Sequence, residues 1–188
     1  MLMASSNQIN CIVPIEVAPA IGAASSPVTI QVVYGAASTR AFRVTVVAAD
    51  PGVFSFAGGG QGQAALLNFD NASGSYSINS AKTAAARGSA ISIYATGMGD
   101  LTGATGANGV VATEAAGLAD NTARVDIDGQ PAVVTYAGAS PGAVAGLVQV
   151  NAVVPPTART GPAIPITVSI GSAAASRRSQ PGLTLAVK

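Results

Sequence analysis

The chain has 188 residues, of which 49% are hydrophobic, 9% are charged and 4% are aromatic, and its formal net charge is +1. Soluble domains carry about 25% charged residues, and disordered chains pair low hydrophobicity with high net charge, so this composition indicates a folded protein with few ionic groups. The chain contains no His, the most frequent general base and metal ligand, and its apolar runs are far shorter than the roughly 18 residues of a membrane-spanning helix. The composition therefore argues against most enzymes and against insertion into a membrane.

Short runs rich in Val, Ile and Thr alternate with clusters of Gly, Pro, Ser and Asn, a pattern typical of all-β proteins. Within residues 28–32 (VTIQV) apolar and polar side chains alternate, so one face of this strand should pack and the other should face water. Asp128-Gly129 predicts a hairpin turn, because this pair favours the tight turns that join antiparallel strands. The predicted strands are residues 8–13, 28–34, 41–47, 91–96, 123–127, 132–136, 147–153, 164–170 and 183–187, with a small hairpin over residues 66–78.

Two stretches of the chain repeat one strand pattern. Residues 7–14 (NQINCIVP) match residues 148–155 (VQVNAVVP), and residues 30–35 (IQVVYG) match residues 166–171 (ITVSIG). In each copy the second stretch is followed by a turn that contains Ser and by a last apolar strand. Two copies of one strand unit are therefore expected.

The two copies are unequal, since strands over residues 91–136 precede the second copy and only six residues precede the first. The sheet that should cover Ile9, Val28 and Ile30 is thus unaccounted for in the first copy. Residues 51–82 could fold back over it, another chain could cover it, or the chain could be the end of a longer protein, which is the favoured interpretation. Exposed apolar strands also predict self-association through the first copy.

Several further motifs recur between the repeats and carry a resemblance to a known family. The motifs are ADPGVF at 49–54, GQGQAA at 60–65, ARGS at 86–89, IYATGMG at 93–99, GQPA at 129–132 and YAGASPG at 136–142. Together with the repeated Gln-x-Asn-x-x-Val-Pro strands, they resemble an uncharacterised C-terminal domain family first noticed as a large paralogous set in Solibacter. The pieces GSAISIYATG and GQPAVVTY are also similar to IPT/TIG immunoglobulin-like domains.

The resemblance implies tandem immunoglobulin-like β-sandwiches at the end of large exported or surface proteins, in a family without established catalytic residues. Residues 1–56 are then expected to form a partial immunoglobulin-like unit, because its early strands are absent. Residues 57–84 are expected to be a Gly/Ser/Asn-rich connector that contains the small hairpin. Residues 85–188 are expected to form a complete IPT/TIG-like sandwich.

Motifs that would carry chemistry are absent or incomplete. The glycines after residues 91–96 lack the third Gly and the helix of a dinucleotide-binding loop, and residues 58–63 lack the Lys-Ser/Thr ending of a phosphate loop. Asp126 and Asp128 would share one strand face but lack the further oxygen ligands of a Ca²⁺ site. Cys11 is expected to be a small buried side chain, because the second copy has Ala at this position. No catalytic residue, cofactor or metal is expected, and the scattered basic residues predict no nucleic-acid binding.

Polar residues that recur in both copies form the candidate interaction site. In each copy a Gln and an Asn stand at alternate positions of one strand, so the two side chains share a sheet face. Such a pair is either a strip that recognises a ligand or a structural hydrogen bond on a wet face. The residues of this candidate strip are Gln8, Asn10, Gln149 and Asn151.

The expected function is a non-catalytic structural, adhesion or protein-interaction module in the C-terminal part of an exported bacterial protein. The alternative is a carbohydrate-binding accessory module of a secreted hydrolase. Either would meet a protein or polysaccharide at the cell surface, and residues 1–6 lack the features of a signal peptide, so the export signal is expected outside this chain. An exposed aromatic row would favour the alternative; its candidate members are Tyr34, Tyr76, Tyr94 and Tyr136.

Overall fold

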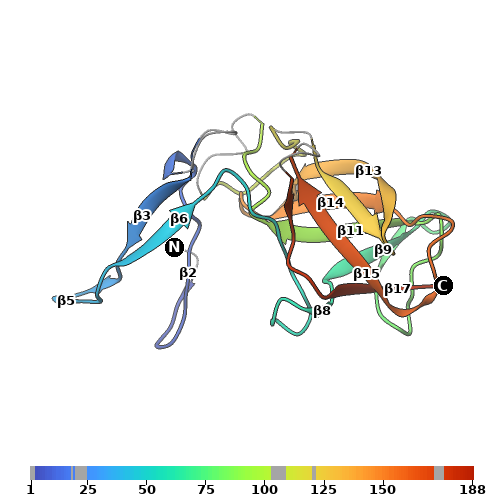
Figure 1. The fold of residues 1–188 in the computed structure, drawn as a ribbon, viewed down its shortest axis with the longest axis horizontal. Helices are drawn as coiled ribbons and strands as arrows, with labels where there is room; N and C mark the ends of the chain where they lie inside the picture. The colour runs from blue at the N-terminus through green and yellow to red at the C-terminus, as the bar shows by residue number, and fades with distance from the viewer. Residues whose placement is uncertain (1–2, 18, 20–24, 103–108, 120–121, 172–175) are drawn as a thin grey trace. The chain divides into compact units, whose positions relative to one another are not determined.

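A computed structural model describes residues 3–17, 19, 25–102, 109–119, 122–171 and 176–188 (Figure 1). The chain divides into two compact units, Met1–Ala49 (unit 1) and Asp50–Lys188 (unit 2). The described residues form strands, turns and a single 3-10 turn at Ile15–Val17, so the prediction of an all-β protein is confirmed.

Unit 2 is built on one large sheet. Its pairings are antiparallel, except that the last strand of the chain runs parallel to β8. β7 (Gly52–Val53) and β16 (Arg177–Arg178) add short pairings to β11 and β15. The strand order along the sheet is β10 (Ser75–Ile78), β9 (Leu66–Asp70), β11 (Ala90–Thr96), β14 (Val148–Val153), β13 (Gln130–Ala139), β12 (Arg124–Ile127), β15 (Gly161–Ile170), β17 (Leu183–Val187) and β8 (Gly62–Gln63).

The large sheet curls, and its apolar inner face forms the core of unit 2 (Figure 1). Alternate residues of each strand point inward, as the period of two requires, and each fully buried Val, Leu or Ile contributes about 1.5–3 kcal/mol to stability. The largest side chains with almost no exposure include Leu66, Ile91, Ile93, Ile127, Val148, Val150, Val168, Leu183 and Leu185.

The hairpin of β12 and β13 links the two halves of the curled sheet. Asp128 and Gly129 have φ angles of 56° and 70°, which is the left-handed pair that a two-residue hairpin turn needs, so the predicted turn is confirmed. β12 pairs with β15, whereas β13 pairs with β14 on both sides of a bulge between Val134 and Tyr136. One hairpin thus contacts both halves of the sheet.

Residues 57–84, which the sequence presents as a connector, take part in the large sheet. β9 and β10 form the hairpin expected over residues 66–78, and β9 pairs with β11. β8 pairs with β17, and the amide of Asn79 bonds to both the N–H and the carbonyl of Ala186 on that strand. The Gly/Ser/Asn-rich composition hid these pairings, because β9 and β10 gain their order from the neighbouring strands rather than from a strong pattern of their own.

Unit 1 consists of three two-stranded pieces: β1 (Met3–Ala4) with β2 (Ile9–Asn10), β3 (Ser26–Ile30) with β6 (Phe42–Val46), and β4 (Val33–Tyr34) with β5 (Ala37–Ser38). The sequence repeat aligns β3 with β15 and the following strand, β6, with β17. The register agrees with this alignment. Val28 lies opposite Val44 in unit 1, and Ile164 lies opposite Leu185 in unit 2.

Corresponding strands differ sharply in burial. Ile30 is 51% exposed and Phe42 is 51% exposed, whereas their counterparts Ile166 and Leu183 are 4% and 2% exposed. Cys11 is exposed as well, so the prediction of a buried thiol is wrong. The prediction rested on the match of Cys11 with the small residue Ala152. Ala152 is buried in unit 2, whereas Cys11 is exposed among the described residues.

Candidate functional site

Strand register gathers aromatic side chains on one side of unit 2. On β11 the inward residues are Ile91 and Ile93, so Tyr94 lies on the opposite side, called here the outer face. The outer face is the side of β10, β9, β11, β14 and β13 that points away from the core. Tyr76 on β10 lies opposite Phe69 on β9, which in turn lies opposite Ala90 on β11 and therefore shares this face.

The Phe69 and Tyr76 rings pack on each other, with ring centroids 5.0 Å apart and planes tilted by 45°. This tilted arrangement is one that aromatic pairs favour, and it holds both rings in place. Tyr76 remains 58% exposed, so the pair presents aromatic surface to solvent.

Phe54 extends the aromatic surface beside Tyr94. Its N–H donates to the Tyr94 carbonyl at 3.1 Å, and it follows the buried Val53, which lies opposite Ala95. Alternation along the strand places Phe54 on the outer face next to Tyr94. Its side chain is 42% exposed.

Tyr136 supplies the fifth ring, at the β13 side of the face. It lies opposite Asn151, and its hydroxyl donates to the Ala139 carbonyl at 2.6 Å. A Cβ at Gly138 would stand 2.1 Å from the Ala116 carbonyl oxygen and 2.8 Å from the Tyr136 hydroxyl, so the close approach of the Ala116 backbone requires a glycine here. Five of the eight Phe and Tyr residues of the chain thus share the outer face.

The amides of the candidate strip lie in the middle of this face. Gln149 is opposite Tyr94 on one side and Gly138 on the other, and its Nε2 donates to Asn151 Oδ1 at 2.9 Å. Both amides are half-buried. Their mutual bond fixes the two side chains and leaves amide groups that can bond to a ligand.

The counterpart pair in unit 1 makes the same bond. Gln8 Nε2 donates to Asn10 Oδ1 at 2.8 Å, and both side chains are exposed. The structure therefore brings together the two members of each pair. Gln149 and Asn151 are flanked by the outer-face rings of their own unit, and Tyr34, the tyrosine of unit 1, is 88% exposed on β4.

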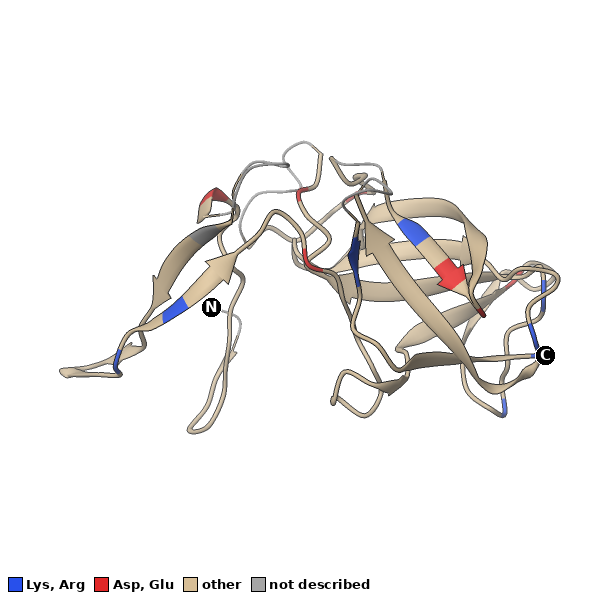
Figure 2. Cartoon of the chain, in the orientation of Figure 1, with Lys and Arg blue, Asp and Glu red and all other residues tan. Residues whose placement is uncertain are grey.

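The outer face carries aromatic, aliphatic and amide side chains and is uncharged. Burial, with a smaller effect of Tyr76, raises the pKa of the Tyr94 hydroxyl above its usual value, and burial raises the pKa of the Tyr136 hydroxyl as well. Both phenols therefore stay protonated at neutral pH. None of the residues that the register places on this face is charged, and charged side chains are scattered over the rest of the described chain (Figure 2).

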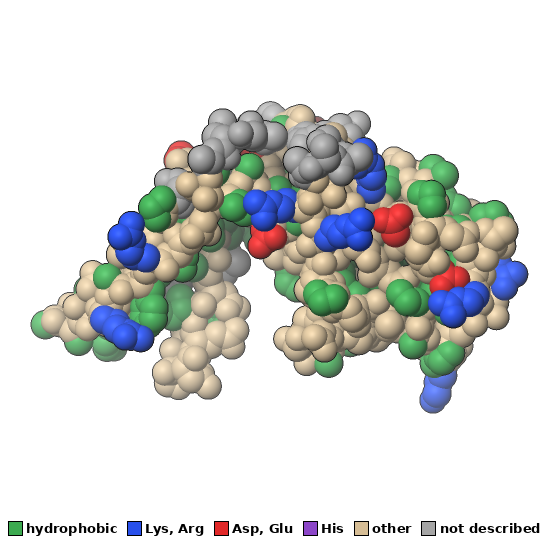
Figure 3. All heavy atoms as spheres, viewed as in Figure 1, with side chains coloured by type: hydrophobic (Ala, Val, Ile, Leu, Met, Phe, Trp, Pro, Cys, Tyr) green, Lys and Arg blue, Asp and Glu red, His purple; other side chains and the backbone are tan. Residues whose placement is uncertain are grey.

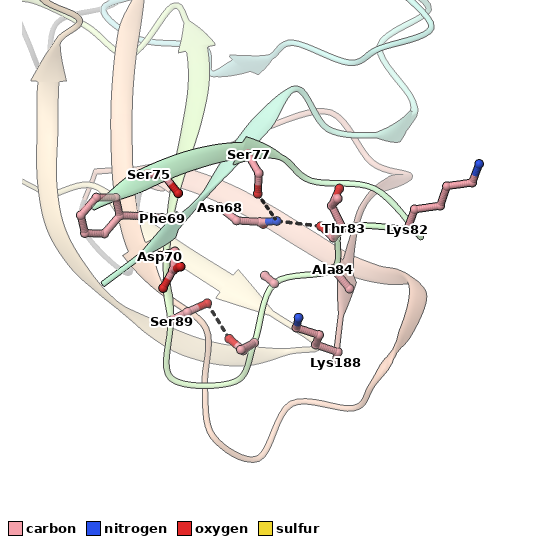
Figure 4. Close-up of a pocket in the computed structure, with 12 residues that line it drawn as sticks. Asn68, Phe69, Asp70, Ser75, Ser77, Lys82, Thr83, Ala84, Ser89 and Lys188 are labelled. Atoms are coloured by element: carbon pink, nitrogen blue, oxygen red, sulfur yellow. Dashed lines mark hydrogen bonds between the residues drawn. The ribbon is translucent and has the colours of Figure 1, made fainter. Parts of the chain in front are cut away.

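A hollow of about 350 Å³ lies on the other side of the β9–β10 hairpin (Figure 4). Asn68 crosses it, donating to the Thr83 carbonyl at 2.7 Å, while the Phe69 ring points away from it. Asp70 accepts hydrogen bonds from Ser73 and from the Ala72 N–H, which lower the pKa of its carboxyl. The hollow is lined by a mixture of hydroxyls, alanines and charged side chains, among them Lys82 and Lys188, and so lacks the predominantly apolar lining that is typical of small-molecule sites.

Asp128, at the turn of the β12–β13 hairpin, has a structural role. Asp128 accepts bonds from the Arg159 Nε at 2.9 Å and from its backbone N–H at 2.8 Å, so this arginine clamps the turn. Hydrogen bonds from Arg159 hold the pKa of the Asp128 carboxyl below its usual range. Within the described ranges there is no group of three or more Cys, Asp or Glu that could hold a metal ion.

Comparison with protein-family models, with characterised proteins and with solved structures finds no match for this chain. Within the part of the chain that the structure describes, no helix has the length and apolar character to span a membrane.

Of the four tyrosines that the sequence offers as candidates for an aromatic row, Tyr76, Tyr94 and Tyr136 lie on the outer face, and Tyr34 lies on β4 of unit 1. Phe54 and Phe69 were not among the candidates. Phe54 stands one position after Val53, and Phe69 stands three positions after Leu66; both Val53 and Leu66 are buried. Alternation from these apolar residues could have placed each ring on the solvent side of its own strand, but the shared face depends on the register between the strands.

Proposed function

We propose that the chain is a non-catalytic binding module whose outer face binds an extended polysaccharide. The observation that carries the proposal is the gathering of five aromatic rings around Gln149 and Asn151 on one uncharged sheet face. Carbohydrate binding, the alternative function in the sequence analysis, is therefore proposed ahead of a general adhesion role.

The chemistry of a sugar chain fits such a face. One face of a pyranose ring is made of C–H groups, which pack on exposed aromatic rings such as Tyr76 and Phe54. Sugar hydroxyls both donate and accept, as do amides and protonated phenols. The absence of charge favours a neutral glycan over a phosphorylated or strongly acidic one.

We also propose that the chain consists of tandem immunoglobulin-like units related to the Solibacter-type C-terminal family and to IPT/TIG domains. The chain would then belong to a secreted or surface protein. The matching register of β3–β6 and β15–β17 supports two copies of one unit. A module of this kind would hold a polysaccharide at the cell surface without acting on it.

A protein-interaction role is the second candidate. It is favoured by Val133 and Ile78, which are 68% and 56% exposed at opposite margins of the outer face. Exposed aliphatic side chains contribute to protein contacts but add little to the recognition of a sugar hydroxyl.

The test is depletion of the full chain from solution by microcrystalline cellulose, chitin and insoluble xylan. We expect at least one of them to bind the chain, and Tyr94→Ala and Tyr76→Ala each to weaken that binding at least tenfold. Tyr34→Ala is the matched control, since it removes an exposed tyrosine of unit 1. Binding to none of the three solids, or an equal loss in the control, contradicts the proposal.

A further inference from the structure

In unit 2 the β12–β13 hairpin pairs with two strand edges, and the corresponding edges of unit 1 have no such hairpin among the described residues. We propose that unit 1 binds a β-hairpin donated by another polypeptide. This hairpin would have the alternating pattern of β12 and β13. The inference is independent of polysaccharide binding, because it concerns unit 1 and not the outer face.

The correspondence between the units identifies these edges. β2 matches β14 through the shared Gln-x-Asn-x-x-Val-Pro motif, and β3 matches β15 with the same register to the strand that follows. The Gln–Asn side-chain bond recurs in both copies as well, at 2.8 Å and 2.9 Å. Unit 1 therefore holds the counterparts of β14, β15 and β17.

In unit 2 the β12–β13 hairpin joins these strands. β12 pairs along β15, with Val125 opposite Val168 and Ile127 opposite Ile166. β13 pairs along β14, with Val134 opposite Ala152. The side chains that the hairpin covers are almost fully buried, Val168 at 0% exposure.

In unit 1 the same edges have no such partner among the described residues. The counterpart of the β15 segment that pairs with β12 is residues 30–33, at the end of β3 and the start of β4. These two strands pair with β6 and β5, and β2 pairs only with β1. Val32, the counterpart of Val168, is 40% exposed, and Ile9, the counterpart of Val150, is 44% exposed. Apolar side chains are visible on the surface of these strands in Figure 3.

These features define the chemistry of the partner. One arm must add to the edge at residues 30–33 and the other to β2, so two strands joined by a short turn fit where a single strand would cover only one edge. Each arm should carry Val or Ile at alternate positions facing the apolar side chains of unit 1, and polar residues between them. An Asp-Gly turn like that of β12–β13 would set the register.

The experiment uses the full chain and a synthetic peptide with the sequence of residues 122–139 (TARVDIDGQPAVVTYAGA). Amide hydrogen exchange is measured by mass spectrometry with increasing peptide. We expect saturable protection of residues 30–33, the counterparts of the β15 residues that pair with β12, and of residues 8–11, with exchange slowed at least tenfold. Exchange in β12 and β13 of the chain itself should be unchanged. A peptide with Asp at the positions of Val125 and Ile127 is the control and should give no protection.

A chain variant keeps the test independent of peptide folding. Ile30→Asp should abolish the protection, whereas Thr29→Asp, whose side chain points to the opposite side of β3, should retain it. Two results would overturn the inference. One is absence of protection at saturating peptide; the other is concentration-dependent protection without peptide, because unit 1 would then be covered by a second copy of the chain.

Discussion

At the scale of single residues, one buried amide holds the edge of the large sheet together. Asn79 has no exposed surface, and all four bonding positions of its side-chain amide are used. Its Oδ1 accepts from Gln63 Nε2 and from the Ala186 N–H, each at 2.8 Å, and its Nδ2 donates to Asn68 Oδ1 and to the Ala186 carbonyl. The amide thus ties β9 and β8 to β17.

Asn79→Ala should therefore lower the free energy of unfolding by about 2–3 kcal/mol, because it leaves buried donors and acceptors without partners. Urea unfolding followed by circular dichroism measures the loss. Asn71→Ala, in the exposed turn between β9 and β10, should change the midpoint little. Equal effects of the two substitutions would show that the amide network does not stabilise the sheet.

A glycine permits the close approach of the chain entering unit 2. Gly97 has φ +68°, and a Cβ there would stand 2.2 Å from the Asp50 carbonyl oxygen. The left-handed conformation alone costs about 1–2 kcal/mol for a residue with a Cβ, and the contact with Asp50 adds to this. Gly97→Ala should lower the unfolding temperature well below that of Gly59→Ala, a position with open space and no positive φ. Similar melting curves for the two variants would contradict this account.

At the scale of elements, the β12–β13 hairpin is stabilised by its clamp on Arg159. Because the folded state lowers the pKa of Asp128, the carboxylate stabilises the fold above its ordinary pKa, near 3.8, and this stabilisation is lost as the pH falls through the lower folded value. Asp128→Asn keeps a side chain that tolerates φ 56° but removes the charge.

The variant should consequently be less stable than the parent at pH 7, and the difference should shrink as the pH falls from about 4 toward 2. Urea midpoints at several pH values measure this. Asp126→Asn is the control, since the bonds of Arg159 go to Asp128. A stability difference that did not depend on pH would rule out the ionic clamp.

Elements with strong local patterns were predictable, and those ordered by their neighbours were not. The Asp128-Gly129 turn and the alternation of residues 183–187 carry their own signals, and β12, β13 and β17 appear where expected. The predicted strand 28–34 is divided into β3 and β4, and strand 8–13 is reduced to Ile9–Asn10, because these edges lack the partners that extend β15 and β14. The outer face was only partly foreseen, since shared faces across β9, β11 and β14 depend on register between distant segments.

At the scale of the whole molecule, the two units should differ in local stability. β3 and β6 form a two-stranded piece with exposed apolar side chains, whereas β11 and β14 lie inside the large sheet. Two-stranded pieces are marginal in water, so amides of β3 and β6 should exchange at least a hundredfold faster than those of β11 and β14 in the free chain. Hydrogen exchange measures this, and equal protection in both units would indicate that unit 1 is already covered.

The low charge of the chain agrees with the proposed binding of a neutral glycan. With 9% charged residues and no His, the surface offers amides, hydroxyls and aromatic rings rather than acid–base groups. A face of this kind is suited to neutral ligands, and its binding should vary little with salt, because no ionic contact is involved.

The central claim is that the outer face binds a neutral glycan chain, and an NMR titration of the full chain with cellohexaose and with chitohexaose tests it most directly. We predict saturable shifts of the side-chain amides of Gln149 and Asn151 and of the backbone around Tyr94, with those of Gln8 and Asn10 unchanged. Shifts confined to unit 1, or none with either hexasaccharide, would contradict the claim.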